Sequence, residues 1–153
     1  MEIEGMEKLI SNIKNIQDKI DLAILRIVNE TTLQVEKDAK GSMKGGAGGK
    51  RHSAPGEPPY VQSGNLRRNV TSELANLIKG VEIKGKVGVR SMVGYGVAME
   101  FGAPPHSISR AFGREGSVRH PGNLPRPFLR PALAKNMIKF KYKLERAIAE
   151  VCK

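Results

Sequence analysis

The sequence predicts an α+β fold, in which long N-terminal and C-terminal helices pack on a small antiparallel sheet, with short helices and two extended basic loops. Apolar residues recur every three or four positions near both ends of the chain, which indicates the two helices. Apolar and polar residues alternate between 81 and 89, which indicates strands. The 153 residues suffice for one domain, 1–153, with a modest core.

The first long helix is expected over residues 5–39. Its apolar stripe consists of Met6, Leu9, Ile13, Ile16, Ile20, Ile24 and Ile27, with Ile10 and Val28 widening it. Lysines and acidic residues occupy the opposite face, and Gly41 is expected to stop the helix. Because isoleucine has only a moderate helix propensity, a packing partner must stabilise this helix.

Residues 41–62 are expected to form the first extended loop. Six glycines and three prolines lie between 41 and 59, a composition that excludes regular structure. The loop lacks the GK[ST] element of a phosphate-binding loop. Lys44, Lys50 and Arg51 give it positive charge for contacts with neighbouring proteins or DNA.

Residues 63–102 are expected to hold a short helix, strands and a second short helix. In "SGNLRRNV", Ser63 is the predicted N-cap and Leu66 faces inward. Strands are predicted between 68 and 90, where Gly85 and Lys86 could form a turn that divides one stretch into two strands. The stretch 92–101 is predicted to be helical, with Gly102 in the left-handed cap conformation.

Residues 103–127 are predicted to form the second extended basic loop, and residues 128–153 the last helix. Arg110, Arg114 and Arg119 are the loop's candidate contacts to neighbours or DNA. One face of the last helix carries Leu129, Leu133, Met137, Phe140, Leu144, Ile148 and Val151. Since proline disfavours helical geometry in the preceding residue, the regular helix is expected to begin at Pro131, after an entry turn "PFLR".

The net charge of +11 is distributed unevenly. Residues 1–40 carry six basic and eight acidic side chains, whereas 41–127 carry thirteen and five and 128–153 carry seven and two. Such a field favours an acidic partner, either nucleic acid or protein, although a solvated surface that maintains solubility is the alternative. Neither a membrane span nor a secretory signal is predicted, because no apolar run is long enough and the first residues are acidic.

We find no catalytic, cofactor-binding or metal-binding constellation in the sequence, which favours a protein that is not an enzyme. His52, His106 and His120 lie in Gly/Pro-rich stretches without the spacing of helical metal ligands, though convergence of the three on zinc is an alternative. Glu100 has no second carboxylate at a recognisable spacing, and Cys152 has no evident activating base. A small enzyme is therefore the least favoured of the three functions that we consider, and the other two follow below.

Nucleic-acid binding is the stronger competitor. Arginines in "KRH", "LRRN" and "ISRAFGREGSVRH" could meet phosphates. The chain has only seven Phe and Tyr and no Trp, and these do not alternate with the arginines as in a base-stacking platform. Any such binding is expected to involve the phosphate backbone of the nucleic acid and to show no sequence preference.

Three phrases in fixed order carry a resemblance to a known family: "APGEPPYVQSGNLRRNV", "VGYGVAMEFG" and "LPRPFLRPAL". Together they resemble the tail-component family of long-tailed bacteriophages, the neck or tail-completion proteins related to the lambda protein Z type. The match covers about residues 54–134. Gly96 stands where this family usually has alanine, and Ala103 stands where threonine is common.

The resemblance implies a structural virion protein of the head–tail junction, assembled in the host cytoplasm. It implies a homo-oligomeric ring, expected to have six copies, that joins head-connector or head-closure proteins to tail-terminator or tail-tube proteins. Contact with DNA in the channel would be non-specific, and no membrane is involved.

The resemblance also assigns structural roles to named residues. Tyr95, Phe101 and Phe128 would be core or interface anchors, and Gly102 would end the short helix. Glu100 would pair with an arginine inside or between subunits, with Arg67, Arg68 and Arg126 as candidates. The alternative is an exposed Glu100 at a helix end.

Overall fold

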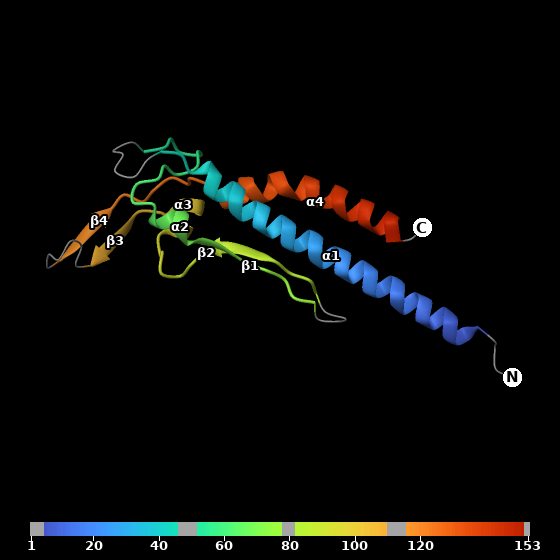
Figure 1. The fold of residues 1–153 in the computed structure, drawn as a ribbon. Coiled ribbons are helices and arrows are strands. Elements are labelled where there is room, and N and C mark those ends of the chain that lie inside the picture. The colour runs from blue at the N-terminus through green and yellow to red at the C-terminus, as the bar shows by residue number, and fades with distance from the viewer. Residues whose placement is uncertain (1–4, 46–51, 78–81, 110–115, 152–153) are drawn as a thin grey trace.

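The computed structural model describes residues 5–45, 52–77, 82–109 and 116–151, and it confirms the α+β class. The elements in chain order are α1 (Met6–Ser42), α2 (Asn65–Asn69), β1 (Val70–Glu73), β2 (Lys86–Val89), α3 (Gly96–Phe101), β3 (His106–Ser109), β4 (Ser117–His120) and α4 (Leu129–Val151). In Figure 1, α1 lies between α4 on one side and the β1–β2 hairpin on the other, and the β3–β4 pair lies beyond the C-terminal end of α1.

Helix α1 ends at Ser42, beyond the predicted end at residue 39, so the expected stop at Gly41 is wrong. Ala39 and Met43 are both buried in the core, and their burial stabilises the extra turn. The Ser42 hydroxyl donates a hydrogen bond to the Ala39 carbonyl oxygen at 2.8 Å. At the other end, Gly5 precedes the helix with a φ of 98°.

Helix α4 packs antiparallel to the C-terminal part of α1. The buried Asn136 donates to Asp38 on α1 at 2.9 Å and to the Ala132 carbonyl oxygen at 2.9 Å. Farther along, the Lys143 ammonium donates to Glu30 at 3.0 Å. With a rise of 1.5 Å per residue, α1 is about 55 Å long and α4 about 35 Å, so α1 extends beyond its partner (Figure 1).

The β1–β2 pair is antiparallel, with Val70 opposite Val89 and Glu73 opposite Lys86. A turn at Gly85 and Lys86 is wrong, because Lys86 already begins β2 and residues 82–85 are not a strand. Residues 78–81 lie outside the described part. The chain just before β2 lies very close to α1 at Gly85. A Cβ added to Gly85 would lie 2.0 Å from the Thr32 hydroxyl oxygen.

A second antiparallel pair, β3–β4, lies within the segment 103–127 that we predicted to be an extended loop, and that prediction is wrong for these strands. His106 pairs with His120 and Ile108 with Val118. Each strand carries only one aliphatic residue, so the alternation that reveals a strand is too weak to recognise. Residues 110–115 are outside the described part of the chain.

The described residues of the predicted loop 41–62 lack regular structure from Met43 onward, and backbone hydrogen bonds connect them to other segments. The Val61 N–H donates to the Lys44 carbonyl oxygen at 2.8 Å, and the Gly56 N–H to that of Pro125 at 2.8 Å. The N-cap of α2 is Gly64, with a φ of 75°, instead of the predicted Ser63. The Ser63 hydroxyl oxygen nevertheless accepts a hydrogen bond from the Asn65 N–H at 3.3 Å.

The hydrophobic core lies where the end of α1, the start of α4 and the middle segment meet. It consists of Val35, Ala39, Met43, Leu66, Val70, Val93, Phe128 and Ala132. The inward orientation predicted for Leu66 is confirmed. Within the described ranges, no helix is long and apolar enough to cross a membrane.

Candidate functional site

The short helix α3 lies directly on β2 and thereby fixes the position of Glu100. A Cβ added at Gly96 would lie 3.0 to 3.3 Å from the Val89 side chain, so glycine permits the close approach. The Arg126 N–H donates to the Met99 carbonyl oxygen at 2.7 Å, and the Asn123 amide donates to that of Ala98 at 2.7 Å. These bonds hold the chain that leads into α4 against α3.

Glu100 is 3% exposed, and its carboxylate caps the N-terminus of α4. One carboxylate oxygen accepts the backbone N–H groups of Phe128 at 2.8 Å and Leu129 at 3.0 Å. The other accepts the N–H of Arg130 at 2.9 Å and the guanidinium Nε of the same residue at 3.3 Å. A negative group at this position also interacts favourably with the helix macrodipole.

This cap explains why α4 begins at Leu129 instead of at Pro131, so the predicted separate entry turn is wrong. Pro131 occupies the first turn, where its missing N–H needs no partner. Neither Pro127 nor Phe128 has a side chain that can cap a helix. The capping acceptor therefore comes from another element of the fold.

The same contacts set the ionisation of Glu100. Burial raises the pKa of this carboxyl, because removal from water disfavours the charged form. The three backbone N–H donors and the Arg130 side chain outweigh burial, and the pKa of Glu100 lies below its ordinary value. An ionised carboxylate with both oxygens engaged is suited to holding two segments together, not to proton transfer.

The arginine that pairs with Glu100 is Arg130, so the three candidates from the sequence are wrong. Arg126 instead donates from Nε to the Ser53 carbonyl oxygen at 3.2 Å, while Arg67 and Arg68 are exposed. The Arg130 guanidinium also donates to the Glu100 carbonyl oxygen at 3.1 Å. The alternative of an exposed Glu100 is excluded as well.

Arg130 connects the buried carboxylate to an exposed aromatic ring. Its guanidinium carbon lies 4.9 Å from the ring centroid of Phe101, which is the distance of a cation–π contact. The Phe101 side chain is 61% exposed, so Phe101 is not a core anchor of the single chain.

The remaining structural candidates divide between core and surface. Phe128 is fully buried in the core, whereas Tyr95 is 46% exposed. Gly102 ends α3 as expected and has a positive φ of 82°. Its ψ of 172° differs from the predicted left-handed helical conformation and is accessible essentially to glycine alone.

The basic loop candidates are only partly described. Lys44 is exposed beside the end of α1, and Arg119 is exposed on β4. Lys50, Arg51, Arg110 and Arg114 lie outside the described residues.

His106 and His120 face each other across the β3–β4 pair, with ring centroids 5.0 Å apart. Nδ1 of His120 lies 3.0 Å from the Gly122 backbone nitrogen, whose N–H it accepts. In the described ranges, no group of three or more His, Cys, Asp or Glu residues could hold a metal ion.

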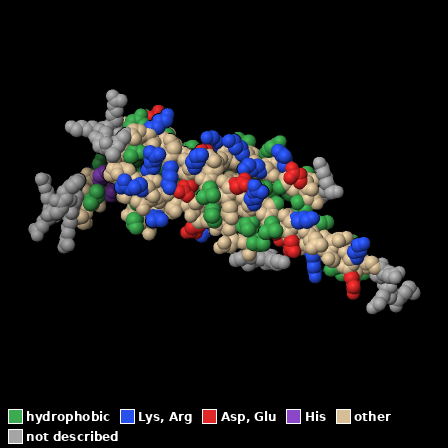
Figure 2. All heavy atoms as spheres, viewed as in Figure 1, with side chains coloured by type: hydrophobic (Ala, Val, Ile, Leu, Met, Phe, Trp, Pro, Cys, Tyr) green, Lys and Arg blue, Asp and Glu red, His purple; other side chains and the backbone are tan. Residues whose placement is uncertain are grey.

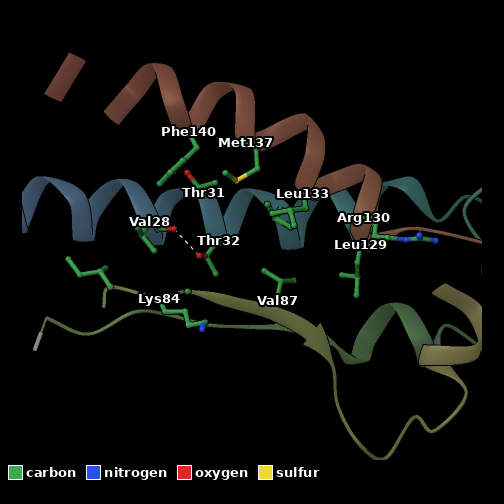
Figure 3. A pocket seen from close by; sticks show the side chains of 13 residues that line it. Val28, Thr31, Thr32, Lys84, Val87, Leu129, Arg130, Leu133, Met137 and Phe140 are labelled. Atoms are coloured by element: carbon green, nitrogen blue, oxygen red, sulfur yellow. Dashed lines mark hydrogen bonds between the residues drawn. The ribbon is translucent and has the colours of Figure 1, made fainter. Parts of the chain in front are cut away.

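A second feature is an apolar groove of about 390 Å³ between α1, α4 and the segment around β2, which we call the groove. Figure 3 shows Val28 and Thr32 of α1, Val87 of β2 and, on α4, Leu133, Met137 and Phe140 around it. The apolar lining residues are Val28, Val35, Ile83, Val87, Leu129, Leu133, Met137 and Phe140. The groove is open to solvent, and Leu133 is 50% exposed.

A third feature is the part of α1 that extends beyond α4. All residues from Met6 to Lys19, which we call the arm, are exposed. The apolar stripe runs along the arm, where Leu9 is 55% and Ile13 is 57% exposed. The first fully buried residue of α1 is Ile27. Among the described residues, the predicted stripe thus becomes buried in the second half of the helix.

Sequence reasoning missed both the cap partner and the groove. A signal for the cap was present, since α4 begins without a capping residue of its own while an isolated acid stands in an apolar segment. No comparable signal predicts the groove, because its walls come from three distant segments.

In comparisons with known proteins, no family model, curated protein or solved structure matches the chain.

Proposed function

We propose that this chain is a structural, non-enzymatic subunit of a bacteriophage head–tail junction, which acts by assembling into a ring around the DNA channel. The observation that carries the proposal is the apolar stripe of the arm, which the described part of the chain leaves exposed. An amphipathic helix of this kind needs a second apolar surface to be stable. The resemblance of the three sequence phrases to neck and tail-completion proteins selects this assembly among others.

The site around Glu100 supports a structural role for the residues in the second and third phrases. Its carboxylate joins the end of "VGYGVAMEFG" to "PRPFLR" through three backbone N–H groups. In the proposed function this junction makes the body rigid, so that neighbours meet a fixed surface. Head-connector or head-closure proteins would bind one side of the ring and tail-terminator or tail-tube proteins the other.

The proposal is tested by deleting the gene from the phage that encodes it and imaging the lysate by electron microscopy. We expect full heads and separate tails, or particles with defective joints. The numbers of heads and of tails should be unchanged. Complementation with the wild-type gene should restore joined particles. Normal joined particles from the deletion phage would overturn the proposal, as would an enzymatic activity abolished by Glu100→Gln in a chain that still enters particles.

Sequence-independent binding of nucleic acid is a second candidate, favoured by the cations on the surface. Lys and Arg side chains are distributed over the face shown in Figure 2. Arg67 and Arg68 are exposed beside Lys40, and neither arginine has an ion-pair partner among the described residues. This candidate would be favoured if the chain bound duplex DNA with an affinity that falls steeply as the salt concentration rises, and if Arg67→Ala lowered the affinity for all DNA sequences equally.

A further inference from the structure

We propose that two adjoining clefts beside α2 form one binding site for single-stranded nucleic acid, in which tyrosine rings stack on bases and arginines hold phosphates. The inference rests on the second candidate function, sequence-independent binding of nucleic acid, and does not depend on the head–tail assignment. It adds where the strand lies and which form of nucleic acid the site takes.

The two clefts, which we call the tyrosine cleft and the arginine cleft, share part of their walls. The tyrosine cleft has a volume of about 90 Å³, and Tyr60 and Tyr95 line it. The arginine cleft has a volume of about 520 Å³, and Lys40, Arg67 and Arg68 line it. The residues common to both walls are Val61, Ser63, Gly64 and Arg67. The clefts therefore form one continuous surface.

Tyr60 and Tyr95 offer unoccupied ring surface. Tyr60 is 36% exposed and Tyr95 is 46% exposed. Within the described ranges, neither ring makes a ring–ring or cation–π contact. Two of the three tyrosines of the chain thus line one cleft, although they are far apart in the sequence. Aromatic side chains at such a surface stack on nucleic-acid bases without regard to sequence, because every base has a ring face.

The charge of the arginine cleft suits a phosphate backbone. Arg67 and Arg68 are exposed, and Lys40 adds a third cation, which an ion pair with Glu36 partly neutralises. Of the described residues that line the two clefts, none is acidic. A polyanion at this surface therefore meets positive charge and no repelling carboxylate.

Backbone hydrogen bonds hold the walls of both clefts in place. The Val61 N–H donates to a carbonyl oxygen just beyond the end of α1 at 2.8 Å. The Arg68 N–H donates to the Gly64 carbonyl oxygen at 2.9 Å, and the Met99 N–H to that of Tyr95 at 2.9 Å. Because the segments that carry the rings and the guanidinium groups are already ordered, less conformational freedom is lost when a strand binds.

The combination of rings and cations selects a single strand over a duplex. In a duplex the bases stack on one another, so their faces are closed to a side chain. In a single strand a base can lie on an aromatic ring while its phosphates contact arginines. A cationic surface without the tyrosines would bind both forms through phosphate charge. A preference for unpaired bases is therefore the consequence that distinguishes this site.

The first experiment measures the fluorescence anisotropy of three labelled probes near physiological salt. The probes are an oligothymidylate, the same strand paired with oligoadenylate, and an abasic strand of equal length. We expect the chain to bind the oligothymidylate about fivefold or more tightly than the other two, because only this probe offers bases to the rings. Equal affinity for the three probes, or a preference for the duplex, would overturn the inference.

The second experiment removes one ring. We expect Tyr95→Leu to weaken binding of the oligothymidylate about fivefold or more and to change the affinity for the abasic strand by less than about twofold. Tyr95→Phe keeps the ring and should bind like wild type. Tyr142→Leu is the matched control, because Tyr142 is 61% exposed on α4 and lines neither cleft.

Circular dichroism checks the fold of each variant, and Tyr60→Leu repeats the test from the other wall if Tyr95→Leu does not fold. Folded variants at Tyr60 and Tyr95 that bind the oligothymidylate like wild type would contradict the stacking role.

The third experiment removes one cation. Arg67→Gln is expected to weaken binding of the oligothymidylate and of the abasic strand alike, and to reduce the salt dependence of the affinity by about one phosphate contact. Lys141→Gln is the control, since it removes the same charge from an exposed position on α4 outside both clefts. Equal effects of the two substitutions would show that only the overall charge matters, and they would overturn the site.

The outcomes separate this inference from both candidate functions. A chain that binds the three probes equally leaves sequence-independent binding standing and removes the single-strand site. A chain that binds none of them removes the second candidate function and the inference together. Neither result changes the outcome of the gene deletion, so the head–tail proposal is tested independently.

Discussion

At the level of single residues, Glu100 combines two properties that rarely occur together: it is almost completely buried and it is ionised. Three backbone N–H groups and one guanidinium offset the free energy of removing the carboxylate from water. Without it, the three backbone N–H groups at the start of α4 would lose their acceptor. The residue therefore serves as a capping group supplied by a distant segment.

Replacing Glu100 by alanine is expected to lower the free energy of unfolding by about 2–3 kcal/mol, since the cap is lost and buried N–H groups have no acceptor. Urea denaturation followed by circular dichroism measures the change. Glu73→Ala is the matched control, because Glu73 is exposed and its ion pair with Lys86 is at the surface. Equal loss in both variants would contradict the capping role.

The lowered pKa of Glu100 predicts how acid affects the fold. Its folded-state pKa lies below the usual value of 4.5, so its contribution is complete above that pH and is lost as pH falls through the folded value. Glu30, Glu36 and Asp38 have pKa values lowered in the same sense. The difference in unfolding free energy between wild type and Glu100→Gln isolates Glu100, and it should shrink below pH 4.5. A difference that is constant with pH would contradict this assignment.

The resemblance carried by the three sequence phrases implied a paired Glu100 but not the correct partner. Glu100 is buried, as an inward partner of an arginine would be. Which arginine it meets depends on how α3 and α4 dock, and that is a tertiary property. Arg130 follows Phe128 closely, so the pairing arises from the capping contact itself.

At the level of elements, the close contact between α1 and the segment before β2 depends on Gly85. The Thr32 hydroxyl lies in the space that a side chain at 85 would fill, and it donates to the Val28 carbonyl oxygen at 2.8 Å. The hairpin can therefore dock on the helix only because position 85 has no side chain.

Gly85→Ala is expected to destabilise the fold by about 1–3 kcal/mol through overpacking. Thr32→Ala removes the nearest atom, so the double variant should lose less stability than the sum of the two single variants. Thermal unfolding of the three variants gives the coupling free energy. Gly88→Ala is the control, because no atom lies within 4 Å of its added Cβ. Additive effects would show that Gly85 does not contact Thr32.

The long helices were predictable because their apolar periodicity extends over many turns. Their ends were not, because burial of Met43 and the cap from Glu100 decide them. The β3–β4 pair was missed for the opposite reason: four-residue strands contain too few apolar positions to show a period. The two strands are instead recognised by their pairing with each other, a contact that local preference does not reveal.

At the level of the whole molecule, the chain divides into a body with a core and an arm without one. The core residues of α1, Val35 and Ala39, lie in its second half, and the core residue Met43 follows the end of the helix. The predicted stripe from Met6 to Ile27 is correct as a sequence pattern, yet a single chain covers only its last part. The sequence cannot show which apolar residues of a helix the folded chain buries and which it leaves exposed, because both sets consist of the same residue types.

This division predicts that a chain lacking residues 1–19 folds but does not assemble. Of the described residues, the deletion removes none that is buried, since Ile27 is the first buried one in α1, and the contacts between α1 and α4 are retained. We expect the melting temperature of the shortened chain, compared at equal dilution with that of wild type, to change by no more than a few degrees. Sedimentation velocity should show a monomer where wild type associates. An unfolded product would show instead that the arm stabilises its own body, and a shortened chain that associates like wild type would place the interface elsewhere on the molecule.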